Sequence, residues 1–148
     1  MTYEINETHD PNLKSWVESA NDPNTDFPIQ NLPFCMFWRS AESEAPHLGV
    51  AIGDQIFDLY QAIVSGILGD EFDSLADEID LCDLSFLAEV YGTAILADLR
   101  SSAFAVLRDD ADDQTIEDAR DFLVPIGRVG PELAFEIGDY TDFYCSIY

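Results

Sequence analysis

The sequence predicts an α+β fold in which a small antiparallel sheet or barrel precedes amphipathic helices and an extended C-terminal segment. Three observations support this prediction. Two apolar runs flank a tight-turn pair at Gly53-Asp54, apolar residues recur three and four positions apart after Leu59, and the residues after Pro131 read as extended chain. With 148 residues, of which 47% are hydrophobic, the chain is long enough to bury a core.

The N-terminal residues are polar. The turn-forming stretch NDPNTD at Asn21–Asp26 predicts a loosely held lead-in over residues 1–25, with at most one short helix around Leu13–Ser19. The globular part begins near Phe27. An apolar and aromatic run at Pro33–Trp38 then suits a strand that begins at a proline or lies at the edge of a sheet.

The clearest local signal is the stretch HLGVAIGDQIFDL, which ends at Leu59. Glycine at position 53 tolerates the positive φ that a tight two-residue turn requires. We therefore expect Leu48–Ile52 and Gln55–Asp58 to pair as a hairpin. Together with Pro33–Trp38, this hairpin gives the small antiparallel sheet or barrel.

The apolar period becomes helical after Leu59. In the longest stretch the apolar positions lie three or four apart: Leu84, Leu87, Tyr91, Ile95, Leu99 and Ala103. This spacing predicts amphipathic helices that pack on a core, with Gly66, Gly69 and Gly92 as breaks or close-packing points.

A last helix is predicted at Thr115–Pro125, with Thr115 as its candidate N-cap. A stretch rich in proline and glycine follows and marks a boundary. The sequence therefore predicts a globular part that begins near Phe27 and a boundary near Pro125.

The charge is strongly negative, with thirty Asp and Glu against six Lys and Arg and a net charge of −24. Such a surface repels polyanions, so neither nucleic acid nor an anionic membrane is expected as a partner. Two interpretations of the excess remain, namely adaptation to high salt and an acidic face for a basic partner. The spread of acids from Glu4 to Asp142 favours the first.

The three cysteines, Cys35, Cys82 and Cys145, are widely separated and form no CxxC pair. We expect reduced thiols. The N-terminus carries no signal-peptide pattern, and no apolar run approaches the ~20 residues of a membrane-spanning helix. These features predict a soluble, cytoplasmic protein.

Polar and aromatic residues cluster in the final stretch, EIGDYTDFYCSIY. Tyr140, Asp142 and Tyr144 are spaced two apart, so in an extended chain their side chains point the same way. A carboxylate between two phenols can bind a hard cation, while the phenols hold an anionic or carbonyl-bearing ligand. Packing of half-buried tyrosines on a strand is the alternative that the chemistry alone leaves open.

Three segments resemble the fumarylacetoacetase family, in the family's order. They are DFPIQNLPFCMFWRSAESEAPHLGVAIGDQIFDL at Asp26–Leu59, LRDDA at Leu107–Ala111 and IGDYTDFY at Ile137–Tyr144. The resemblance implies an N-terminal SH3-like small β-barrel with attached helices. It also implies that the extended C-terminal segment begins a second, larger β-rich catalytic domain.

The resemblance further implies hydrolysis of the carbon–carbon bond of 4-fumarylacetoacetate, a diketo acid of tyrosine and phenylalanine breakdown, to fumarate and acetoacetate. In the family a calcium or magnesium ion orients the diketone and stabilises the departing carbanion. By position in the motif, Asp142 corresponds to a metal-binding carboxylate and Tyr144 to a substrate-binding tyrosine.

The family's general-base histidine would fall directly after Tyr148, and its other metal carboxylates lie further downstream. His9 and His47 are the only histidines of this chain, and neither lies in a family motif. His47 is predicted to be a surface residue. No residue is therefore predicted as catalytic, and we expect the isolated chain to be inactive.

The full-length family forms homodimers, whereas we expect this chain alone to be a monomer whose segment Glu132–Tyr148 is poorly packed. Two other functions remain open. One is a stand-alone, non-catalytic SH3-like protein-interaction module. The other is an acidic mimic that captures a basic partner, although this would not explain the intact stretch IGDYTDFY.

Overall fold

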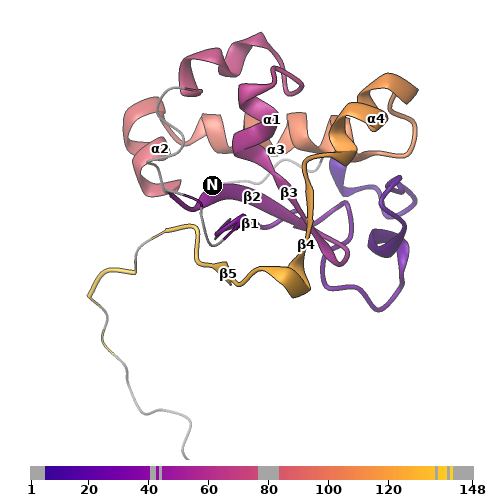
Figure 1. The fold of residues 1–148 in the computed structure, drawn as a ribbon, viewed down its shortest axis with the longest axis horizontal. Helices are drawn as coiled ribbons and strands as arrows, with labels where there is room; N and C mark the ends of the chain where they lie inside the picture. Colours follow the sequence, from indigo (N-terminus) through magenta and orange to yellow (C-terminus); the bar gives the residue numbers. More distant parts are fainter. Residues whose placement is uncertain are drawn as a thin grey trace, which may run out of the picture.

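A five-stranded antiparallel sheet with helices around it forms the body of the molecule in the computed structural model (Figure 1). The structure describes residues 6–40, 43, 45–76, 84–135, 137–139 and 141. The strands are β1 (Phe34–Phe37), β2 (His47–Ile52), β3 (Gln55–Asp58), β4 (Leu123–Pro125) and β5 (Pro131–Glu132). The α-helices are α1 (Leu59–Val64), α2 (Leu84–Tyr91), α3 (Ala94–Leu107) and α4 (Asp113–Arg120). Short 3-10 helices are η1 (Glu7–His9), η2 (Glu18–Asn21), η3 (Asp70–Leu75) and η5 (Ile126–Arg128).

The predicted hairpin is confirmed as strands β2 and β3. Ile52 pairs with Gln55 next to the turn, and Gly53 has a φ of +56°. A side chain at this position would also collide with η2, because a Cβ on Gly53 would lie 2.6 Å from the backbone nitrogen of Ala20. Glycine is thus required both by the turn and by the close approach of the N-terminal segment.

The sheet has the order β4-β3-β2-β1-β5 and is open. Strand β1 confirms the expected strand at Pro33–Trp38 and pairs with β2 along its whole length. The edge strands β4 and β5 have three and two residues, and no pairing joins them within the described parts of the chain. The closed SH3-like barrel is therefore not confirmed, whereas the mixed α and β composition is.

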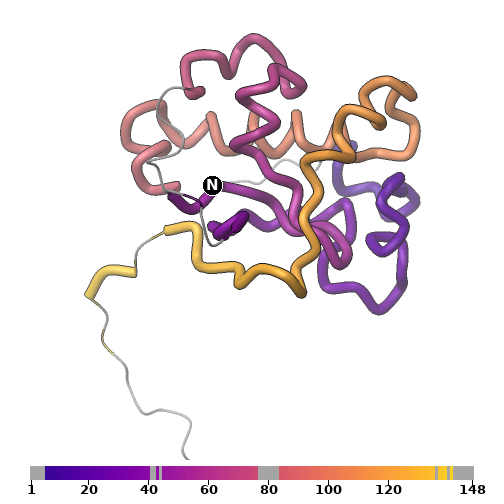
Figure 2. Tube along the Cα trace, viewed as in Figure 1, coloured from indigo at the N-terminus to yellow at the C-terminus, as the bar shows by residue number. Residues whose placement is uncertain are grey.

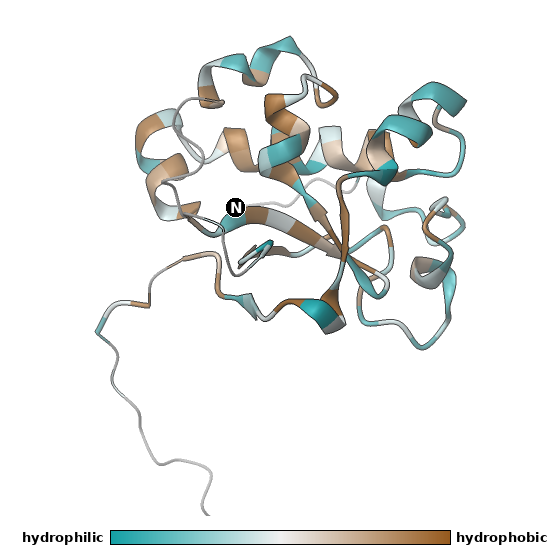
Figure 3. Ribbon diagram, in the orientation of Figure 1, coloured by the Kyte–Doolittle hydropathy of each residue, from teal (hydrophilic) through white to brown (hydrophobic). Residues whose placement is uncertain are grey.

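The helices behave as their apolar period predicts. The long periodic stretch forms α2 and α3, and Gly92 separates them with a φ of +83°. Their buried residues join those of α1 and of the strands in one core, and Figure 3 shows apolar ribbon along α1 and the central strands. A smaller cluster on other sheet residues contains Cys35, Phe37, Ile56 and Val124, packed against Ile126 and Val129.

The helix predicted at Thr115–Pro125 is wrong at both ends. Helix α4 is capped by Asp112, whose Oδ1 accepts a hydrogen bond from the Thr115 backbone nitrogen at 3.0 Å. Its last residue is Arg120, and Leu123–Pro125 instead form β4 against β3. The free edge of β3 supplies hydrogen bonds to this segment, and a partner so distant in sequence leaves no local pattern.

The N-terminal lead-in is not loosely held over the residues that the structure describes. Ser15 donates its hydroxyl to the Leu107 carbonyl at 2.5 Å, and the Trp16 indole donates to the Val106 carbonyl at 2.9 Å. Figure 2 shows this indigo segment beside the orange α4, where the Arg120 guanidinium lies 5.5 Å from the Trp16 ring centre. The prediction of a loosely held lead-in was based on the polar composition of the segment, which does not indicate the contacts that a few of its side chains make with distant residues.

The chain after β4 turns through η5 and continues along the other edge of the sheet. Met36 pairs with Glu132 and Phe37 with Pro131, and Ala134 is buried. The Ala134 carbonyl accepts a hydrogen bond from the Leu84 nitrogen at 2.7 Å. The start of the segment expected to pack poorly is therefore attached to β1 and α2.

No single helix among the described residues is long and apolar enough to cross a membrane. Helices α2 and α3 reach that length and composition only when taken together, across a bend of 116°.

Candidate functional site

The residues predicted to bind metal and substrate, Asp142 and Tyr144, lie outside the described residues, as does Tyr140. Of the predicted site stretch, Asp139 is described and is exposed. Within the described ranges, no group of three or more His, Cys, Asp or Glu side chains is arranged to hold a metal ion. The roles of Asp142 and Tyr144 stay predictions.

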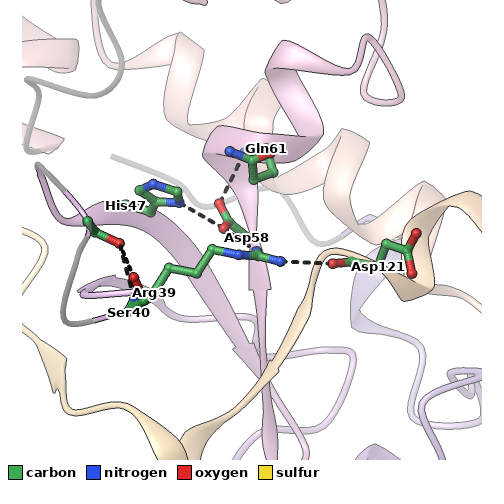
Figure 4. Close-up of polar contacts among 7 residues, drawn as sticks. Arg39, Ser40, His47, Asp58, Gln61 and Asp121 are labelled. Carbon is green, nitrogen blue, oxygen red and sulfur yellow. Dashed lines mark hydrogen bonds and ion pairs between the residues drawn. The ribbon is translucent and has the colours of Figure 1, made fainter.

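The structure instead brings together a buried polar cluster around Asp58 (Figure 4). We call Arg39, His47 and Asp58 the Asp58 cluster. Asp58 Oδ2 accepts hydrogen bonds from Arg39 Nη1 at 2.7 Å and from His47 Nδ1 at 2.8 Å. The Asp58 side chain has no solvent exposure, whereas that of His47 is 13% and that of Arg39 is 34% exposed.

Four parts of the fold position this cluster. Asp58 ends β3 and caps α1, since its Oδ1 accepts a hydrogen bond from the Gln61 backbone nitrogen at 3.0 Å. His47 begins β2, and Arg39 follows β1 by two residues. Arg39 Nη2 also donates to the Asp121 carbonyl at 3.1 Å, which ties the turn after α4 to the cluster.

The electrostatics explain why these partners are needed. A buried carboxylate is stable only when it is paired and hydrogen-bonded. Asp58 has two side-chain donors on Oδ2 and a helix N-terminus on Oδ1, where the helix dipole also favours an anion. An ionised carboxylate can only accept, so His47 Nδ1 contacts it as the donor in the tautomer that has its hydrogen on that nitrogen.

His47 was predicted to be a surface residue, and this prediction is wrong. Its ring centre lies 4.5 Å from that of Tyr60 and 5.9 Å from that of Phe37. The other histidine, His9, is exposed and contacts Asn6 at η1. His47 is paired with the carboxylate of Asp58, and its bonds together with those of Arg39 join β1, β2, β3 and α1, so the Asp58 cluster connects elements of the fold.

Sequence reasoning missed the Asp58 cluster. One signal was present, because aspartate directly before the apolar helical run LYQAIV is typical of an N-cap. The pairing with partners 11 and 19 positions away depends on the register of β1, β2 and β3, which no local pattern states.

A shallow pocket of about 420 Å³ lies between η2, the β2–β3 turn and α4. Its lining includes Ser19, Asp54 and Arg120. The Ser19 hydroxyl donates to Asp54 Oδ1 at 2.6 Å, and this bond, followed by one from Gln55, holds the pKa of Asp54 below its usual value. These contacts fix the turn against η2.

Of the three cysteines, Cys35 lies within the residues that the structure describes. Cys35 lies on β1 in the smaller apolar cluster, and burial raises the pKa of its thiol to about 11. A thiol that remains protonated is a poor nucleophile and a poor metal ligand. Cys35 therefore acts as a core residue.

Comparison with known proteins identifies relatives for most of the chain. Residues 30–133 match the family described as fumarylacetoacetase N-terminal. The fumarylacetoacetase of Caenorhabditis elegans is 37% identical, over 92% of this chain and 32% of that protein. Those of Rattus norvegicus and Oryza sativa subsp. japonica are 36% and 34% identical, over 90% and 92% of this chain and 31% and 32% of those proteins.

The chain thus spans about a third of the length of the curated relatives it matches. The match includes the hairpin, the helices, β4 and β5, and all three members of the Asp58 cluster. The chain belongs to the fumarylacetoacetase N-terminal family.

Proposed function

We propose that these residues are the N-terminal part of a fumarylacetoacetase, a metal-dependent hydrolase that cleaves the carbon–carbon bond of 4-fumarylacetoacetate to give fumarate and acetoacetate. The family match over residues 30–133 supports this most directly. The relatives that carry the name fumarylacetoacetase are similar over about nine tenths of this chain, so the likeness is not confined to one short motif.

In this proposal the described domain is a scaffold, and the chemistry depends on residues after it. Asp142 supplies one carboxylate for calcium or magnesium, and Tyr144 contacts the diketo acid. Calcium takes six to eight oxygen ligands, so a single aspartate needs further carboxylates from the region that follows in the relatives. The bound cation would polarise the diketone oxygens. The 148-residue chain alone is then inactive.

The domain itself is proposed to be an SH3-like sheet that is incompletely closed, covering residues 26–125, with residues 126–148 starting the catalytic domain. Strand β5 pairs with β1, so the sheet itself continues to Glu132, past this proposed boundary, and β4 and β5 lie at its opposite edges. Val124 of β4 also packs in one cluster with Cys35 and Phe37 of β1. We further propose a cytoplasmic homodimer for the full-length protein and a monomer for these residues alone.

Hydrolysis of 4-fumarylacetoacetate, followed by loss of the diketone absorbance, tests this proposal. The assay compares the 148-residue chain with a full-length chain in which the region found in the relatives follows Tyr148. Each is measured with calcium, with magnesium and with a chelator. Activity only in the full-length chain, and only with a divalent cation, is expected.

Two results would contradict the proposal. Equal rates with calcium and with the chelator would contradict the proposed metal dependence. Absence of hydrolysis in both chains, when both are folded, would contradict the hydrolase function. The second result would favour a non-catalytic protein-interaction module on the same fold.

A further inference from the structure

The chain before the sheet lies across three elements that follow much later in the sequence, namely the β2–β3 turn, the end of α3 and α4. We call residues 6–29 the N-terminal strap. Its Ser15 hydroxyl and Trp16 indole donate to the carbonyls of Leu107 and Val106, the last two residues of α3. Figure 2 shows the indigo strap beside α4. The strap therefore contacts the domain through specific polar bonds as well as by burial.

Two backbone amides outside the strap donate to its carbonyls, at two separate places. The Gly53 nitrogen, in the β2–β3 turn, donates to the Phe27 carbonyl at 2.8 Å. The Asp109 nitrogen, just after α3, donates to the Lys14 carbonyl at 3.0 Å. These two amides lose their acceptors whenever the strap leaves the domain, so each of them reports on the strap from a different side.

The strap is also bonded within itself. The Asn21 side chain accepts a hydrogen bond from the Ser15 nitrogen at 3.0 Å and donates one to the Ser15 carbonyl at 2.8 Å. The Ser15 hydroxyl accepts from the Val17 nitrogen at 3.0 Å. Because these bonds join residues of the strap to one another, they can remain when the strap moves as a whole.

The sheet and the α-helices are made without the strap. Strand β1 begins at Phe34, and residues 6–29, all of which the structure describes, form only the 3-10 helices η1 and η2 and a single bridge between Ser15 and Arg108. Terminal segments held by few bonds open at a lower free energy than the core of a domain. The sheet and the helices can therefore stay folded while the strap is released.

We propose that the N-terminal strap opens and closes as one unit and that, when closed, it holds the β2–β3 turn, the end of α3 and α4 together. The Arg120 guanidinium of α4 lies 5.5 Å from the Trp16 ring centre, and the carbonyl of the next residue, Asp121, accepts from Arg39. The end of α4 is thus held by the strap and by the Asp58 cluster. Opening of the strap removes the first contact and leaves the second. This inference is independent of the hydrolase function.

Native-state hydrogen exchange of the 148-residue chain, followed by NMR at increasing urea, tests the proposal. Gly53 and Asp109 report opening of the strap. Ala51 is the reference, because its nitrogen donates to the Pro33 carbonyl within the body of the domain. The opening equilibrium constants of Gly53 and Asp109 should be equal, and about tenfold or more larger than that of Ala51. They should also depend less on urea, since opening of the strap exposes less surface than global unfolding.

Two variants separate the strap from the rest of the domain. Ser15→Ala removes the donor to Leu107 and should speed exchange at Gly53 and Asp109 by the same factor, roughly tenfold. Ile63→Val is the control, because Ile63 is buried on α1 and its substitution weakens the core without touching a strap bond. It should speed exchange at Ala51 by about two- to tenfold and leave Gly53 and Asp109 unchanged.

Three results would overturn the proposal. Different opening constants at Gly53 and Asp109 would mean that the two ends of the strap open separately. Opening constants as small as that of Ala51, with the same urea dependence, would mean that the strap opens only when the whole domain unfolds. Acceleration of only one of the two amides by Ser15→Ala would exclude a single unit. The first two comparisons need only the unchanged protein, so they stand even when Ser15→Ala does not fold.

Discussion

Removal of the Asp58 carboxylate is expected to destabilise the fold strongly. Asp58→Ala leaves Arg39 Nη1 and His47 Nδ1 without their shared acceptor and removes the N-cap bond to Gln61. Loss of an N-cap costs about 1 kcal/mol. Loss of one partner of a buried ion pair costs about 3–5 kcal/mol.

The two costs do not add in full. The Arg39 side chain is 34% exposed, so water can solvate part of the guanidinium after the change. We therefore expect a total loss of about 3 kcal/mol in the free energy of unfolding, which lowers the melting temperature by roughly 6–12 °C for a chain of this length. Asp58→Asn keeps an N-cap acceptor for Gln61 but turns an amide NH2 toward the Arg39 and His47 donors, so it should recover only the N-cap part, about 1 kcal/mol, of the stability that Asp58→Ala loses.

Urea unfolding followed by tryptophan fluorescence measures this loss, with the slope m used to check that the two-state character is preserved. Asp98→Ala is the control, because Asp98 is exposed on α3 and its loss changes the net charge equally. The control should stay within about 0.5 kcal/mol of the unchanged protein. If Asp58→Ala also stays within that range, the Asp58 cluster does not stabilise the fold.

Three further predictions concern the turn, the buried thiol and the charge. The urea midpoint of Gly53→Ala should be clearly lower than that of Gly66→Ala. Both glycines have a positive φ, but of the two only Gly53 has atoms within 4 Å of an added Cβ. Equal urea midpoints would contradict the contact with η2. The raised pKa of Cys35 means that the unfolded state ionises first. The free energy of unfolding should therefore fall by about 2–3 kcal/mol as pH rises from about 9 to about 11. This fall should be absent from Cys35→Ala, and identical pH profiles for the two proteins would refute it. Finally, the melting temperature should rise with potassium chloride, because the screening length falls from about 10 Å at 0.1 M to about 3 Å at 1 M and the net charge is −24; a flat response would favour a localised acidic face.

Local chemistry decided which parts of the fold were predictable. The β2–β3 hairpin follows from one turn that only glycine accommodates easily, and α2 and α3 follow from apolar spacing with a break at Gly92. Both signals lie within a few residues of the structure they specify. The strand β4 and the packing of Ser15 and Trp16 depend on partners far along the chain, so sequence patterns did not indicate them.

The same distinction applies to the site. The N-cap role of Asp58 is local, but its pairing with Arg39 and His47 needs three strands in register, and His47 was consequently misread as a surface residue. The proposed roles of Asp142 and Tyr144 come from the family resemblance. Their spacing alone is equally compatible with packing on a strand.

The hydrolase proposal is tested most directly by the rate of 4-fumarylacetoacetate hydrolysis in the full-length chain, measured side by side for the unchanged protein and for Asp142→Ala, with calcium in excess. The unchanged protein should be active, and loss of a metal-binding carboxylate should reduce its rate by roughly 100-fold or more. Circular dichroism of both proteins controls for folding. An Asp142→Ala variant as active as the unchanged protein would contradict the assigned metal role, and an inactive but folded unchanged protein would contradict the function itself.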